Sequence, residues 1–239
     1  MRGVGHATMA AATWAAISAA TPVSLSLVGA DSKVTVLAGG IIAAGAGVWP
    51  DLDHPKASPT IALPPLTTAI HKGVATTSGG HRWGTHSLVG VGIVAGVVSL
   101  LTLAGMTFGG DVGLDPLLAV LSFFTAGMLV RVFHIRYSAA GAWVIGALYA
   151  LAVMLLVPEV GWWLPVAVAL GYFMHIVGDW LTKGGVPWLW PFSKKRYSLG
   201  ILGNVGSTRE IILTWLLAIY VGIVAVLVVA GPLPWLPPN

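Results

Sequence analysis

The sequence contains no cysteine and very little charge. The absence of Cys among its 239 residues excludes disulfides, thiolate metal ligands and a cysteine nucleophile. Asp, Glu, Lys and Arg together make up only 8% of the chain, against roughly 25% in an ordinary soluble domain. Because so few charges cannot cover a soluble surface, a cytosolic globular enzyme is excluded. The hydrophobic content of 56% excludes a disordered chain.

Long apolar segments fill the chain instead. A helix needs about 20 residues to cross a hydrocarbon core of ~30 Å. Seven segments approach this length, and they predict an all-α, polytopic membrane helical bundle with about seven transmembrane helices, folded as a single domain over residues 1–239. The expected spans are residues 7–29, 34–50, 87–108, 116–133, 138–157, 160–182 and 210–231. The first is expected to be a span rather than a signal peptide, because no small-residue cleavage site precedes a polar chain.

Lys and Arg are distributed unevenly between the connections. A cytoplasmic N-terminus puts 11 of the 12 basic residues inside: Arg2, Lys56, Lys72, Arg82, Arg131, Arg136, Lys183, Lys194, Lys195, Arg196 and Arg209. The outer connections then hold Lys33, Asp31, Asp111, Asp115 and Glu159. The positive-inside rule therefore predicts an N-terminus inside and a C-terminus outside, in a bacterial or archaeal cytoplasmic membrane. Basic residues in so apolar a chain set its orientation, so nucleic acid is not expected as a partner.

Most of the remaining ionisable residues fall at one end of the expected helices, the cytoplasmic end. Asp51, Asp53 and His54 end the second span, and His81, Arg82 and His86 precede the third. The same end also receives His6, His134, His175, Asp179 and Glu210. Ionisable groups inside a membrane are costly and mark functional sites.

The spacing of these residues suits metal binding. His175 and Asp179 are four residues apart, which puts both on one helix face as two ligands, or as one ligand and the carboxylate that orients it. A buried ion-pair contact is the alternative. Asp51 and Asp53 repel each other unless a cation lies beside them, or unless they form a helix-ending turn in water. Imidazole combined with carboxylate suits zinc, manganese or iron.

Ten residues are therefore candidates for the site. The expected metal ligands are His6, Asp51, Asp53, His54, His81, His86, His175 and Asp179. They are too many for one ion, which favours two divalent ions, with zinc preferred. Arg82 is expected to hold a substrate oxyanion, and Glu210 to be a general base, a ligand or only a carboxylate at a helix N-terminus. His71 and His134 are expected to be structural residues or residues at the rim of the site, and Thr85, His86 and Ser87 to cap the next helix.

The ordered motifs resemble the YdjM-type membrane-bound metal-dependent hydrolases. The resemblance rests on Pro50-Asp51-Leu52-Asp53-His54, His81-Arg82-x-x-Thr85-His86-Ser87 and His175-x-x-x-Asp179-x-x-Thr182-x-x-Gly185. His6, Trp190-Pro191-Phe192-Ser193 and Gly206-Ser207-x-x-Glu210 are also similar to the family pattern. The resemblance implies a multi-span protein with metal-dependent hydrolase activity. In the style of its ligands the chain also resembles, more loosely, the all-α zinc-dependent phospholipases C and nucleases.

The resulting hypothesis is a hydrolase that uses metal-activated water at the cytoplasmic membrane face, on a phosphoester or lipid-linked substrate. A membrane lipid is thus the expected partner. A divalent metal ion transporter is one alternative, although it would need polar residues through the membrane midplane. A non-catalytic membrane scaffold with a structural metal site is another. The sequence leaves the substrate, the metal and the oligomeric state open. Residues 187–196, rich in Trp, Pro, Lys and Arg, are either an interfacial anchor or part of a lipid site.

Overall fold

A computed structural model describes residues 1–20, 30, 32–108, 115–134, 138–157 and 160–230. Within these ranges the chain forms eight α-helices, two short 3-10 helices and no strand, so the expected all-α class is confirmed. The helices are α1 (Gly3–Ala20), α3 (Lys33–Ala46), η1 (Trp49–Asp53), α4 (Leu66–Thr77), η2 (Gly84–His86), α5 (Leu88–Phe108), α6 (Pro116–Val132), α7 (Ala139–Leu156), α8 (Trp163–Trp180) and α9 (Thr208–Ala230). Asp31, Asp111, Arg136 and Glu159, and residues 21–29 and 231 of the expected spans, lie outside the described residues.

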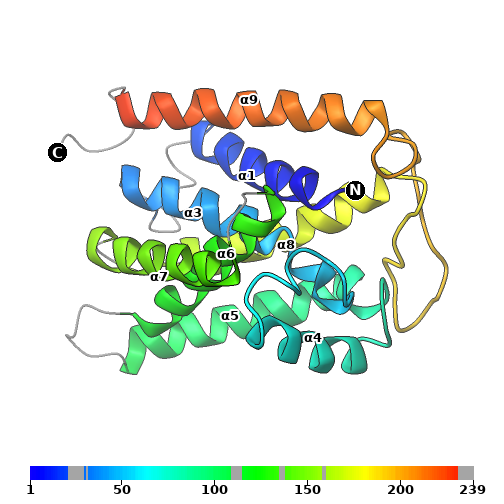
Figure 1. Cartoon of the computed structure of the whole chain (residues 1–239), viewed down its shortest axis with the longest axis horizontal. Helices are drawn as coiled ribbons and strands as arrows, with labels where there is room; N and C mark the ends of the chain where they lie inside the picture. Colours follow the sequence, from blue (N-terminus) through cyan, green and yellow to red (C-terminus); the bar gives the residue numbers. More distant parts are fainter. Residues whose placement is uncertain (21–29, 31, 109–114, 135–137, 158–159, 231–239) are drawn as a thin grey trace.

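Three helices form the centre of the bundle. α1, α3 and α8 pack against one another, α9 lies along α1, α5 lies along α8, and the α6–α7 pair packs against α3 (Figure 1). The predicted polar residues lie at the ends of these helices. Those helix ends meet on one side of the bundle, near α4 and the N-terminus (Figure 1). One apolar core, around Trp14, Ile42 and Trp163, occupies the opposite part of the same central helices.

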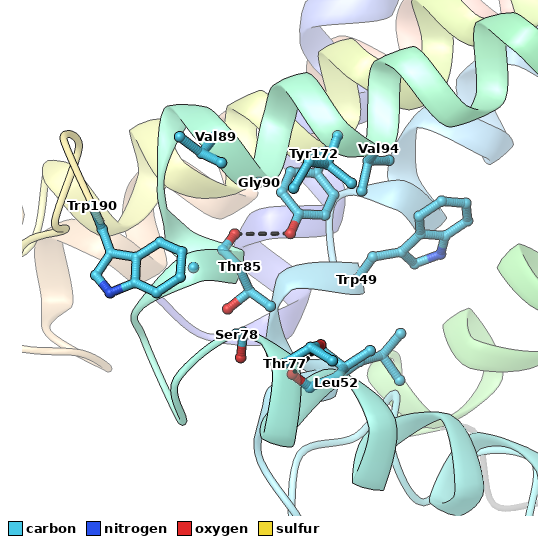
Figure 2. Close-up of a pocket in the computed structure, with 13 residues that line it drawn as sticks. Trp49, Leu52, Thr77, Ser78, Thr85, Val89, Gly90, Val94, Tyr172 and Trp190 are labelled. Carbon is cyan, nitrogen blue, oxygen red and sulfur yellow. Dashed lines mark hydrogen bonds between the residues drawn. The ribbon is translucent and has the colours of Figure 1, made fainter. Parts of the chain in front are cut away.

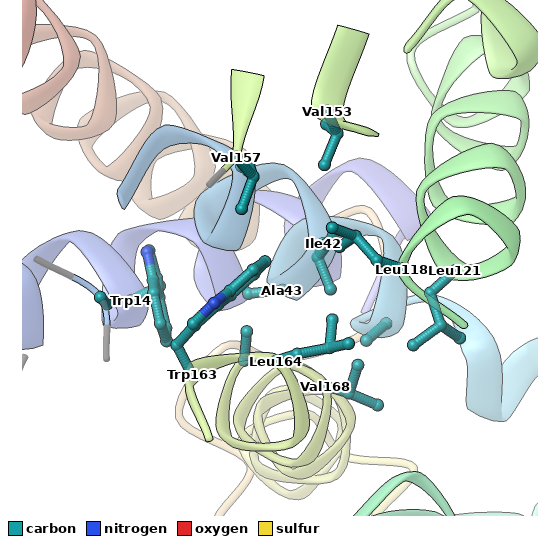
Figure 3. Packing of buried hydrophobic residues seen from close by; sticks show 14 of the residues in the cluster. Trp14, Ile42, Ala43, Leu118, Leu121, Val153, Val157, Trp163, Leu164 and Val168 are labelled. Atoms are coloured by element: carbon teal, nitrogen blue, oxygen red, sulfur yellow. The ribbon is translucent and has the colours of Figure 1, made fainter. Parts of the chain in front are cut away.

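Large side chains pack against glycine in this core. Trp14, Ile42, Trp163 and Val168 are buried together between α1, α3 and α8 (Figure 3). The Trp14 indole nitrogen donates a hydrogen bond of 2.8 Å to the Val36 carbonyl, which satisfies its one polar atom. A Cβ added at Gly39 would lie 2.3 Å from the Trp14 ring. Glycine therefore permits the close helix approach that the small residues of α3 predict.

The outer helices carry exposed apolar surface. Four helical segments are long and apolar enough to cross a membrane: Lys33–Asp53, Leu88–Thr107, Ala139–Leu156 and Thr208–Ala230. α6 is also apolar but has 17 residues. α1 and α8 are not among the four, and both carry buried polar side chains into the bundle. The count of seven spans and the orientation of the termini therefore stay predictions.

Two connections at the polar end have structure of their own. The first contains α4, which is not predictable from the sequence because its Thr-rich segment has no long apolar run. The second follows α8 and folds back on itself, with Val186 and Tyr197 exchanging two backbone hydrogen bonds of 3.0 and 2.9 Å. Phe192 within it is almost fully exposed. These two connections surround the cluster of ionisable side chains.

Candidate metal centre

Helix α8 carries two fully buried ionisable residues one turn apart, His175 and Asp179. The His175 ring nitrogen Nδ1 lies 2.8 Å from the carbonyl oxygen of Gly47, at the end of α3. Because a carbonyl only accepts, Nδ1 must carry the proton. The other nitrogen of neutral His175, Nε2, therefore presents a lone pair to the centre of the cluster.

Two 3-10 helices bring in the next ligands. η1 begins just after α3, with Pro50 in its first turn, and carries Asp51. The Leu52 carbonyl, in the same helix, accepts a hydrogen bond of 2.8 Å from the ring of His71, which has the structural position expected of it. η2 ends with His86, and the Ser87 hydroxyl accepts the Gly90 amide at 3.2 Å, which caps α5 as predicted.

Asp53 orients its neighbours instead of facing the centre. Its carboxylate accepts hydrogen bonds from the Arg82 amide at 2.8 Å, the Thr85 hydroxyl at 2.6 Å and the His81 Nδ1 at 2.7 Å. Since the Thr85 hydroxyl gives its hydrogen to Asp53, its oxygen accepts from His86 Nδ1 at 2.9 Å. Neutral His86 thus also directs a lone pair at Nε2 toward the centre. Such carboxylate-supported imidazoles are typical of metal sites.

Three donor atoms surround one point. The Nε2 atoms of His86 and His175 are 3.2 Å apart, and Asp51 Oδ1 lies 3.7 and 3.8 Å from them. The circumradius of a triangle with these sides is about 2.1 Å, so one point lies at that distance from all three atoms. Zinc binds His nitrogen and carboxylate oxygen at about 2.0–2.2 Å. The donor set therefore fits a divalent transition metal.

A second group of donors shares a member with the first. His6 stacks on His175 with ring centroids 3.7 Å apart, and its Nε2 lies 3.3 Å from Asp179 Oδ1. His6 is buried, and neither ring nitrogen has a hydrogen-bond partner. His6, His175 and Asp179 could together hold an ion. Because His175 has one free ring nitrogen, it can ligate an ion in only one of the two groups.

Positive groups balance the buried carboxylates. Asp179 contacts the Met1 amino group, and Arg82 Nη2 lies 3.1 Å from Asp179 Oδ2. Burial alone would lower the pKa of His86, but the nearby carboxylates of Asp51 and Asp53 outweigh burial and raise this pKa to about 9. The cluster thus favours a cation between its donors, either a proton or a metal ion.

The family model of the YdjM inner membrane protein matches residues 1–232. The chain belongs to the YdjM family. The match includes every candidate site residue, and it agrees with the exposed apolar helices in identifying an integral membrane protein. No curated protein matches the chain, and no solved structure matches it.

Besides Asp53 and Arg82, three predicted residues of this YdjM chain lie outside both donor groups. His54 contacts the edge of the His81 ring at 4.6 Å between centroids, and its Nδ1 accepts the Lys56 amide at 3.2 Å. The buried Glu210 accepts the backbone amides of Arg2 at 2.6 Å and Gly206 at 2.8 Å. The third is His81 itself, which is held by Asp53. Metal ligation by Asp53, His54 and His81 and general-base catalysis by Glu210 stay predictions.

Two contributors to the YdjM site were missed. The Gly47 carbonyl fixes the His175 ring, but a backbone carbonyl leaves no signal in the sequence. Thr85 was expected only to cap a helix, whereas it links Asp53 to His86. Its position one residue before a candidate ligand could have indicated this second role.

Proposed function

We propose that this YdjM-family protein is a membrane-embedded, metal-dependent hydrolase of phosphoesters. The observation that carries the proposal is the triangle formed by Asp51, His86 and His175, with three donor atoms about one point. Catalytic zinc sites use three protein ligands and leave a fourth position open, whereas structural sites are closed. The partial exposure of Asp51, at 20% of its side chain, supports an open side.

Zinc suits this donor set best, with manganese or iron as alternatives. A bound divalent ion would act as a Lewis acid and lower the pKa of water to about 7. We propose one tightly bound ion, because the single free nitrogen of His175 cannot serve both donor groups. A second ion, which the number of candidate ligands favoured, would have to rely on His6 and Asp179 alone.

Different residues of the chain would then carry out the separate steps of hydrolysis. Arg82, with a side chain 20% exposed, would bind the phosphate oxygens. Asp179, whose Oδ2 accepts no hydrogen bond and lies 3.1 Å from Arg82 Nη2, would accept the proton of the attacking water. As the water oxygen bonds to phosphorus, the ester P–O bond breaks, and the leaving oxygen needs a proton. We assign that proton transfer to His81, which is 39% exposed and oriented by Asp53.

We further propose that this end of the bundle faces the cytoplasm. The topology predicted from the sequence puts 11 of the 12 basic residues on the same side of the membrane as this end. The position of the charges argues against a metal transporter. Among the described residues, the buried ionisable side chains are His6, Asp53, His86, His175, Asp179 and Glu210. All six belong to this end, and the buried polar residues elsewhere are only Ser and Thr.

The test is hydrolysis of two reporters, p-nitrophenyl phosphate and bis(p-nitrophenyl) phosphate, by purified protein in lipid nanodiscs. The protein is first stripped with a chelator and then reloaded with Zn²⁺, Mn²⁺ or Fe²⁺. We expect turnover only in the reloaded protein. Asp51→Asn should lose both the metal and the activity, and Arg82→Lys should keep the metal while its KM rises, because Lys cannot bind the anion in a bidentate manner.

Two outcomes would overturn the proposal. Stoichiometric metal without hydrolysis of either reporter would favour the structural scaffold. Metal-dependent ion uptake into proteoliposomes, abolished by Asp51→Asn, would favour transport.

A further inference from the structure

An apolar cavity of about 310 Å³ lies beside the candidate metal centre. It is bordered by η1, the end of α4, the start of α5, Tyr172 and Trp190 (Figure 2). Its wall consists of Trp49, Leu52, Val74, Thr77, Ser78, Gly84, Thr85, Val89, Gly90, Ile93, Val94, Tyr172 and Trp190. None of these side chains is charged, so the cavity suits a hydrocarbon group.

The cavity and the metal centre share a wall. The Thr85 carbonyl accepts a hydrogen bond of 2.8 Å from the Tyr172 hydroxyl inside the cavity (Figure 2). The hydroxyl of the same Thr85 contacts Asp53 and His86 on the other side. Leu52, which also lines the cavity, separates Asp51 from Asp53 in the chain. A ligand in the cavity would therefore lie directly beside the donor triangle.

The cavity is also continuous with the exposed apolar face of α5. Ile93 lines the cavity, yet 60% of its side chain is exposed, and Val97 one turn further along is 50% exposed. In a membrane protein such a face lies against lipid chains. The apolar cavity thus lies beside a polar cluster that includes cationic Arg82, which contacts Asp179, and the donor triangle. An amphiphilic phosphate has the two matching parts, a hydrocarbon chain and an anionic headgroup.

We propose that the cavity binds the hydrocarbon chain of a membrane lipid whose phosphate ester reaches Arg82 and the metal centre. This inference rests on the proposed function, which it deepens by naming the substrate class as long-chain phosphate esters. The volume lies at the lower end of the range for ligand pockets, about 300–1,000 Å³, and so favours one chain.

The test is photocrosslinking in nanodiscs with a dodecyl phosphate that carries a diazirine in its chain. Crosslinked peptides are mapped by mass spectrometry. We expect labels on the segments that line the cavity, and a loss of roughly an order of magnitude in Val89→Phe, because the added ring fills the space. Val97→Phe is the matched control, with the same substitution on the same helix outside the cavity, and it should keep the wild-type labels.

Metal content and thermal unfolding show whether Val89→Phe is folded, and Ile93→Trp provides a second, more exposed way of blocking the cavity. Labels spread evenly over the apolar surface, unchanged by either substitution, would overturn the inference. Labelling is repeated on Asp51→Asn, which lacks the metal. Cavity labelling without hydrolysis in any variant would refute the proposed function alone, and hydrolysis without cavity labelling would refute the cavity inference alone.

Discussion

Asp51 and Asp53 lie two residues apart in η1, but the structure predicts different effects when each is replaced by Asn. Asp51 Oδ1 completes the donor triangle, at 3.7 and 3.8 Å from the two imidazole nitrogens. Asp53 uses its carboxylate to accept three hydrogen bonds, from His81, Arg82 and Thr85. We therefore expect Asp51→Asn to remove a ligand and Asp53→Asn to disturb only the groups around the ligands.

The expected losses of metal affinity differ in size. Structural zinc sites bind with about 10–16 kcal/mol, which shared among four ligands is roughly 2.5–4 kcal/mol each. Asp51→Asn should thus weaken binding several hundredfold. Loss of a group that orients a ligand costs about 10–100-fold. Asp53→Asn belongs to this class, because its amide retains one accepting oxygen while its NH2 group meets a donor.

Competition against a chromophoric zinc chelator measures both affinities on detergent-purified protein. Elemental analysis after gel filtration gives the stoichiometry, and matching thermal unfolding curves would exclude misfolding as the cause. Equal losses in the two variants, or wild-type affinity in Asp51→Asn, would refute the assignment of Asp51 as ligand and Asp53 as support.

Three other predictions concern protonation, packing and the N-terminal segment. Because the pKa of His86 is raised to about 9, the His86 imidazole of ion-free protein is protonated at pH 7. Metal binding should therefore release about one proton, which calorimetry in two buffers of different ionisation enthalpy measures. The metal affinity should rise about tenfold per pH unit up to pH 9 and then level off. Gly45→Val should destabilise the folded protein by about 1–3 kcal/mol, because a Cβ at residue 45 would lie 2.3 Å from Thr125 Cβ. The measurement is the midpoint of thermal unfolding, which should fall. Gly92→Val is the control, because no atom lies within 4 Å of the Cβ position there. Glu210→Gln should lower the midpoint while keeping the metal, since its carboxylate binds two backbone amides; unchanged stability with lost hydrolysis would instead support a general base.

The long apolar runs made most of the fold predictable. The expected span 116–133 differs by one residue from α6, and the span 138–157 differs by one residue at each end from α7. These limits follow from flanking Pro, Ser and charged residues, which end apolar runs visibly. α4 could not be found in the same way, because its helix is stabilised in the folded connection and not by a long apolar run.

Part of the site was predictable because ionisable residues are so rare in this chain. The donor groups unite five of the eight predicted ligands: His6, Asp51, His86, His175 and Asp179. The sequence could not separate Asp51 from Asp53, since both flank Leu52 and their tasks depend on the turn geometry of η1. Nor could it reveal that His81 turns toward Asp53, because that contact joins residues 28 positions apart.

The packing of the core and the position of the ligands are linked through α3 and α8. A Cβ at Gly171 would lie 2.2 Å from the Ala43 carbonyl, so only glycine allows the two helices to approach this closely. One helical turn further along both helices, His175 donates to the Gly47 carbonyl. The contact at Gly171 therefore sets the distance over which that hydrogen bond forms, and the bond in turn aims Nε2 at the centre. In this bundle a small residue in the apolar core has as direct a part in building the site as the charged residues around it.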